Sequence, residues 1–204
     1  MVLRFWIVFL AVLLGGCRDF LAERMVMPPN GMAASQATFP QLGDNGVRIR
    51  VGPPDASLAA WVREPTEASR GTILLLHGFI NDHNQLSSAA KALNAAGYRT
   101  VQVDLRGHGQ STGEHLTFGV DDARDLMQVT DYLQAHHLCG STLGVYGVSY
   151  GAATAILFAG TDPRVTAVVA VAPFSSLREE APYFGRHILP VPGLFLSLIA
   201  HYPD

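Results

Sequence analysis

One serine of this chain is placed where a serine can act as a nucleophile. Ser149 lies in a Gly-x-Ser-x-Gly motif, Gly147-Val-Ser-Tyr-Gly151. An apolar run precedes the motif and a run of small residues follows it, which predicts a tight turn between a strand and a helix. The two glycines suit such a turn, because a side chain at either place would collide with neighbouring backbone. At the start of the helix, free N–H groups and the helix dipole favour the negative charge that forms when a hydroxyl attacks an acyl carbonyl.

Two more glycine-containing segments follow expected strands. They are Leu76-His77-Gly78-Phe79 and Asp104-Leu-Arg106-Gly107-His108-Gly109. In this order and spacing, the three segments resemble the α/β-hydrolase superfamily, especially its serine esterase, lipase and S33 aminopeptidase-like branch. The resemblance covers roughly residues 45–180 and is more specific for the fold than for the substrate. It implies a serine hydrolase of esters, with thioesters or amides as alternatives, that forms an acyl-enzyme on Ser149 with a small-molecule acyl substrate.

The resemblance also implies which groups would stabilise the oxyanion. One donor is the backbone N–H of the residue after the nucleophile, here Tyr150, and the other comes from the loop after the His-Gly strand, here Phe79. Both side chains are also expected to shape an apolar acyl pocket. No cofactor and no metal site are expected, since the sequence holds no phosphate-binding loop, no metal-ligand cluster and no Cys-x-x-Cys pair.

The base and the acid of a triad are not assigned. In the family they follow the serine, acid first and histidine last, and the sequence after Ser149 is too short for the two further strand–helix units that would carry them. His77 is expected to shape the oxyanion loop, and His108 to be structural. His187 and His201 follow the serine and could reach it from a cap, but without a precedent in the family. Other candidates are placed in turns, in polar loops or at helix ends: Asp121, Asp122, Asp162, His83, His115, His136 and His137.

This gap allows two interpretations of the function. In the first, the chain is a C-terminally incomplete hydrolase that would be inactive by itself, because losing triad members costs about 10⁴ to 10⁶ in turnover. In the second, it is a non-catalytic surface lipoprotein that uses the scaffold for binding. The intact serine motif favours the first interpretation, since a binding module has no need of a strained serine.

The N-terminus predicts export. A positive start, an apolar run of about ten residues and Gly15-Gly16-Cys17 are typical of a signal peptide, and the last residues resemble a bacterial lipobox with a lipid-modified Cys17. We therefore expect a signal peptide over 1–17, a tether over 18–45 and a lipid-anchored domain in the bacterial cell envelope. An ordinary secretory signal or an uncleaved anchor is the alternative.

The remaining domain, 46–204, is predicted to be of the α/β class. Its 49% apolar composition allows one sizeable core, and a net charge of −3 without a basic cluster argues against nucleic-acid binding. Residues 47–51 and 58–62 predict an antiparallel hairpin at a sheet edge. Strands are then expected to alternate with helices, which predicts a mostly parallel sheet covered on both faces: strands 72–76, 100–105, 143–148 and 165–172, and helices 86–96, 120–136 and 150–159.

The C-terminal part of this domain carries two further expectations. The strand 165–172 is apolar and uncharged, and without later strands it would leave an open edge through which chains self-associate. Residues 174–204 are expected to begin a cap over the site, with a helix packed on the sheet as the alternative.

Overall fold

The computed structural model describes residues 26–31, 41–140 and 142–176. The chain divides into two units, one of residues 28–175 and one of residues 1–27 with 176–204. The first unit contains nearly all described residues. The predicted signal peptide with Cys17, most of the tether and most of the cap segment lie outside the described residues. Among those residues, no helix has both the length and the apolar character needed to cross a membrane.

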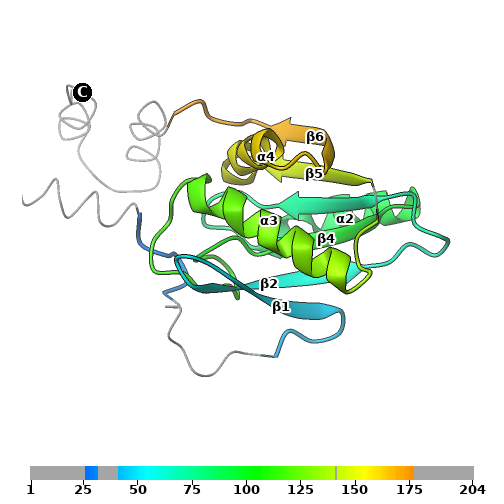
Figure 1. Ribbon diagram of the computed structural model, residues 1–204, viewed down its shortest axis with the longest axis horizontal. Coiled ribbons are helices and arrows are strands. Elements are labelled where there is room, and N and C mark those ends of the chain that lie inside the picture. The colour runs from blue at the N-terminus through cyan, green and yellow to red at the C-terminus, as the bar shows by residue number, and fades with distance from the viewer. Residues whose placement is uncertain (1–25, 32–40, 141, 177–204) are drawn as a thin grey trace, which may run out of the picture. The chain divides into compact units, whose positions relative to one another are not determined.

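A six-stranded sheet forms the centre of the larger unit, in the order β1-β2-β4-β3-β5-β6 (Figure 1). The strands are β1 (Gly46–Val51), β2 (Ala56–Arg63), β3 (Thr72–Leu76), β4 (Arg99–Val103), β5 (Leu143–Val148) and β6 (Val165–Val171). The first two form an antiparallel hairpin at the edge, and β2 joins antiparallel to β4. The other four strands run parallel. The predicted edge hairpin and mostly parallel sheet are confirmed.

Helices cover both faces of this sheet, as the sequence predicts. They are α2 (Ser87–Ala95), which a short 3-10 helix η1 (His83–Leu86) precedes, α3 (Val120–Ala135) and α4 (Tyr150–Thr161). In β3, Leu75 packs with Ala90 of α2, whereas Leu74 and Leu76 belong to the larger core cluster that α3 and α4 complete. Because successive strand residues point to opposite faces, the continuous apolar run of β3 serves two cores at once.

The last strand, β6, is the open edge of the described sheet. It pairs with β5 on one side, and no other strand among residues 26–31, 41–140 and 142–176 pairs with it. Val168, Val169 and Val171 are 38%, 52% and 41% exposed. An apolar strand is therefore exposed on both faces at this edge within the described part of the chain.

Candidate active site

Ser149 lies on the turn that joins β5 to α4, in the strand–turn–helix setting that the motif predicts. Its φ of 51° and ψ of −110° lie in a region that non-glycine residues rarely adopt. Its N–H donates to the carbonyl of Val171 at 2.9 Å, and its carbonyl accepts from Ala152 and Ala153 at 3.0 Å. The strained conformation is thus held by bonds on both sides, as is usual where strain persists at a functional turn.

The glycines of the motif allow the backbone to approach this closely. A Cβ atom on Gly147 would overlap the carbonyl group of Gly151. A Cβ atom on Gly151 would in turn overlap the carbonyl oxygen of Leu76, at the end of β3. The second glycine therefore lets the start of α4 pack directly on the strand that leads into the His77 loop.

The loop after β3 holds the second proposed oxyanion donor, Phe79. The Nδ1–H of His77 donates to the carbonyl of Gly78 at 2.8 Å, and Nε2 accepts from the backbone N–H of Leu105 at 3.0 Å. Burial and the neighbouring His108 lower the pKa of His77 to about 4. Both imidazole nitrogens are engaged, so His77 shapes this loop and does not act as a base, as expected.

Gln85 of η1 also fixes this loop, and no sequence motif singles this residue out. Its side-chain oxygen accepts from the backbone N–H of Gly78 at 2.7 Å. The Gly78 amide is therefore used within the loop.

Tyr150 and Phe79 belong to one aromatic cluster with Phe118 and His108. The Tyr150 ring centroid is 6.3 Å from that of Phe79 and 5.6 Å from that of Phe118. Tyr150 is only 1% exposed, and its hydroxyl donates to Asp122 at 2.8 Å. The expectation that its side chain lines an acyl pocket is therefore wrong for Tyr150, because its ring is needed in the core. Phe79 is half-buried.

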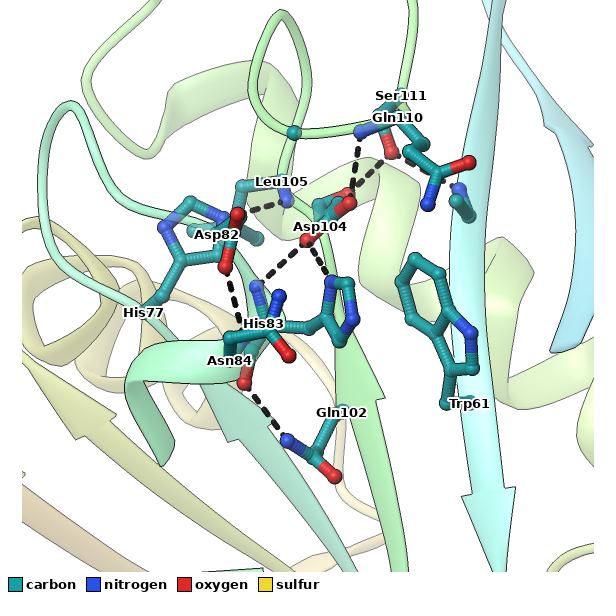
Figure 2. Close-up of polar contacts among 12 residues, drawn as sticks. Trp61, His77, Asp82, His83, Asn84, Gln102, Asp104, Leu105, Gln110 and Ser111 are labelled. Carbon is teal, nitrogen blue, oxygen red and sulfur yellow. Dashed lines mark hydrogen bonds and ion pairs between the residues drawn. The ribbon is translucent and has the colours of Figure 1, made fainter. Parts of the chain in front are cut away.

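Asp104 organises the turn after β4 (Figure 2). Its Oδ1 accepts from the backbone N–H of His83 at 2.6 Å and from Nδ1 of the same residue at 3.0 Å. Its Oδ2 accepts from the N–H of Gln110 at 2.7 Å. Gly109 has a φ of +51°, and a Cβ atom there would overlap this carboxylate. The backbone of the glycine-containing turn after Asp104 therefore packs against the buried carboxylate of this residue.

His83 is held on three sides, which the prediction of a polar loop missed. Its ring stacks on Trp61 of β2 with centroids 3.5 Å apart, and its carbonyl accepts from Gln102 of β4 at 2.7 Å (Figure 2). With Asp104 it forms a histidine–carboxylate pair like that of a triad. The pair makes no hydrogen bond to Ser149: Asp104 follows β4, and β3 stands between β4 and β5, the strand that leads into Ser149.

His108 and Asp162 have the structural roles predicted for them, and the structure adds a buried ion pair beside His108. The Nδ1–H of His108 donates to the carbonyl of Arg106 at 2.9 Å, and burial lowers its pKa. Arg106 forms a buried, two-bond ion pair with Asp125 of α3 at 2.7 and 2.8 Å. The Asp162 carboxylate accepts hydrogen bonds from the Arg164 guanidinium, and these bonds lower the pKa of Asp162. Asp162 therefore stabilises the turn before β6.

A base for Ser149 is not found in the described part of the chain. No histidine there hydrogen-bonds to the Ser149 side chain, and no group of three or more histidine, cysteine or acidic side chains is placed to hold a metal ion. His187 and His201 lie outside the described residues, as do three carboxylates that also follow Ser149 in the chain, Glu179, Glu180 and Asp204.

Comparison with known proteins gives the family. Residues 67–200 match the family model described as serine aminopeptidase, S33. The chain is 31% identical over 142 residues to the uncharacterized protein YqkD of Bacillus subtilis, which covers 64% of this chain and 46% of that protein. It is 30% identical over 131 residues to the lysophosphatidylserine lipase ABHD12 of Gallus gallus, over 59% of this chain and 32% of the lipase. The chain thus spans between about a third and a half of the length of these relatives.

Solved structures agree on the fold. The esterase Pf2001 of Pyrococcus furiosus superposes with a TM-score of 0.64 at 19% identity, over 85% of this chain and 70% of that chain. A probable hydrolytic enzyme of Pseudomonas aeruginosa does so with a TM-score of 0.58 at 23% identity, over 77% and 48%. The sheet order, the strained serine turn and the family match lead to one conclusion: this chain belongs to the serine aminopeptidase S33 family and has an α/β-hydrolase fold.

Proposed function

We propose that the protein is a serine hydrolase of carboxylic esters that forms an acyl-enzyme on Ser149. The observation that carries this proposal is the Ser149 backbone, with a φ of 51° on a turn whose two glycines have no room for a Cβ atom. Such strain is retained where it presents a reacting group. A scaffold that served only for binding would be more stable without this backbone strain.

In this mechanism the Ser149 hydroxyl attacks the acyl carbonyl, and a histidine takes its proton. The N–H groups of Tyr150 and Phe79 stabilise the oxyanion that forms. The alcohol leaves with a proton, and water then releases the acid. His187 and His201 are the first residues to test as the base, because both follow Ser149 in the chain.

Esters are the favoured substrates, and thioesters and amides are the alternatives. An esterase and a lipase are among the proteins that this chain resembles, whereas the family takes its name from an aminopeptidase. A panel of p-nitrophenyl esters of increasing chain length, an acyl thioester and an aminoacyl anilide separates the three. Faster turnover of the anilide than of every ester would overturn the preference for esters.

The test of the nucleophile is labelling with a fluorophosphonate probe. Intact-mass analysis should show one adduct on the wild-type chain and none on Ser149→Ala. Ser87→Ala, which changes another serine at the start of a helix, should label like the wild type. Absence of labelling at every pH between 6 and 9 would contradict the proposal for the 204-residue chain, and is the result that an incomplete hydrolase and a non-catalytic protein would both give. Loss of labelling in His187→Ala or His201→Ala alone would identify the base.

We also propose that Cys17 is lipid-modified and anchors the domain at a bacterial membrane. The support is the lipobox-like sequence before this cysteine. Metabolic labelling with an alkyne fatty acid should mark the wild-type chain and not Cys17→Ser. Equal labelling of both chains would count against the anchor.

A further inference from the structure

The side chain that follows the proposed nucleophile ends in a buried hydrogen bond to another helix. Tyr150 is the first residue of α4, and its hydroxyl donates to Oδ2 of Asp122 at 2.8 Å. Both residues are 1% exposed. Asp122 belongs to the first turn of α3, 28 residues earlier in the chain. The turn that carries Ser149 is therefore anchored to the start of α3 by a directional contact.

Asp122 is itself held in place. The same Oδ2 accepts at 3.1 Å from the backbone N–H of Gly119, the N-cap residue directly before α3. Gly119 has a φ of 100°, and a Cβ atom there would lie 2.8 Å from the Leu157 side chain of α4. The start of α3 thus packs closely on α4, and the carboxylate has little freedom to move.

The protonation of this pair favours a stable bond. Burial raises the pKa of Tyr150 well above its usual value, with the nearby Asp122 carboxylate adding to the effect, so the phenol keeps its proton at neutral pH. Burial also raises the pKa of Asp122. Its second oxygen, Oδ1, is buried without a hydrogen-bond partner in the described part of the chain, so Asp122 is bonded only through the oxygen that faces Tyr150.

The aromatic cluster extends this anchoring to the other side of the site. The rings of Phe79 and Tyr150 are stacked at 26°, and Phe79 also lies 6.1 Å from Phe118, the residue before Gly119. Ring contacts alone permit small slides and rotations, whereas a hydrogen bond to a fixed acceptor sets the position of one ring. The position of Tyr150 therefore also limits where Phe79 can lie.

We propose that Asp122 is a positioning residue for the oxyanion site: through the Tyr150 hydroxyl it sets the direction of the Tyr150 N–H, and through the stacked rings it steadies the Phe79 loop. The inference rests on the proposed function of Ser149 and deepens it. Asp122 is buried and acts only through Tyr150. Because a misplacement of about 1 Å can cost roughly 100-fold in rate, removal of the contact should be visible in kinetics.

The test compares four variants of the full chain in fluorophosphonate labelling. Asp122→Ala and Tyr150→Phe should lower the maximal labelling rate roughly 10- to 100-fold and leave the half-saturating probe concentration unchanged. Asp122→Asn keeps an oxygen that can accept from Tyr150 and should restore most of the rate. Asp125→Asn is the matched control, because it alters another buried aspartate of α3 that bonds to Arg106 and not to Tyr150.

Hydrogen–deuterium exchange of residues 149–153 provides a readout that does not depend on the reactivity of Ser149. Exchange there should rise in Asp122→Ala and Tyr150→Phe but not in Asp125→Asn. If the wild type is not labelled, the proposed function fails, and exchange alone decides the positioning role. The positioning role of Asp122 would be overturned if labelling and exchange were both unchanged in Tyr150→Phe. It would also be overturned if Asp125→Asn changed them as much as Asp122→Ala does. Should Asp122→Ala not fold, Tyr150→Phe carries the test, since it removes one oxygen atom.

Discussion

The Nε2 atom of His77 accepts a hydrogen bond from the backbone N–H of Leu105 at 3.0 Å, while its Nδ1–H donates to Gly78. The imidazole thereby joins the loop after β3 to the chain just after β4. Protonation would set a second N–H against the N–H of Leu105 and break this link. The neutral ring is therefore a structural requirement.

We expect the protein to lose stability as the pH falls from about 6.5 to about 4. The unfolded chain protonates His77 near its ordinary pKa of 6.5, whereas the folded chain does so only at about 4. Below pH 6.5 the unfolded state therefore binds more protons, and stability that is complete above this pH is lost on the way down, by roughly 3 kcal/mol. Urea unfolding at pH 7.5 and pH 4.5 measures the loss.

The variant His77→Gln isolates this contribution. It should be less stable than the wild type at pH 7.5 but should lose less stability on acidification. His115→Gln alters an exposed histidine and should keep the wild-type pH dependence. An equally steep loss in His77→Gln would show that other groups cause it.

Two glycines of α4 should respond to alanine in opposite ways. Gly151→Ala places a Cβ atom on the carbonyl of Leu76 and should cost about 3 kcal/mol or more, with loss of probe labelling. Gly160→Ala meets nothing within 4 Å and should stabilise the helix by about 0.5–1 kcal/mol. Thermal unfolding of both variants checks the pair. A stable Gly151→Ala chain would refute the close approach of α4 to β3.

Replacement of Asp104 by its amide, asparagine, should destabilise the fold. Asp104→Asn replaces one carboxylate oxygen by an NH₂ group that would face an N–H of either His83 or Gln110. We expect a loss of about 2–4 kcal/mol from the unpaired buried donors. The control Asp121→Asn alters a pair with the exposed Arg124 and should cost less than about 1 kcal/mol. Similar losses in the two variants would contradict the central role of Asp104.

The edge strand β6 is predicted to mediate self-association. Val169 is 52% exposed on an uncharged strand, and a charge there discourages strand pairing. Val169→Lys should therefore shift the chain toward monomer in light scattering after size exclusion. Val120→Lys, at a 57% exposed position of α3, should not. A wild-type chain that is monomeric at all concentrations would contradict the prediction.

Much of the fold could be predicted because its signals are local. The apolar runs that became β3, β5 and β6 are continuous, and the helices begin and end within a few residues of the predicted bounds. The setting of Ser149 could also be predicted, since both glycines, the strand and the helix lie within one short stretch. The predicted signal peptide and lipidated Cys17 lie outside the described residues, and no acid or base for Ser149 could be assigned from the sequence.

The sequence by itself determined the class of the fold, its strands and helices, and the serine on its tight turn. These follow from periodicity and from steric rules that act over a few residues. Only the tertiary structure decided that Tyr150 bonds to Asp122, that Asp104 holds His83 against Trp61, and that β3 lies between the strand before Asp104 and the strand before Ser149. Such contacts join residues far apart in the chain. They depend on the order of strands and the packing of helices, which no local pattern specifies.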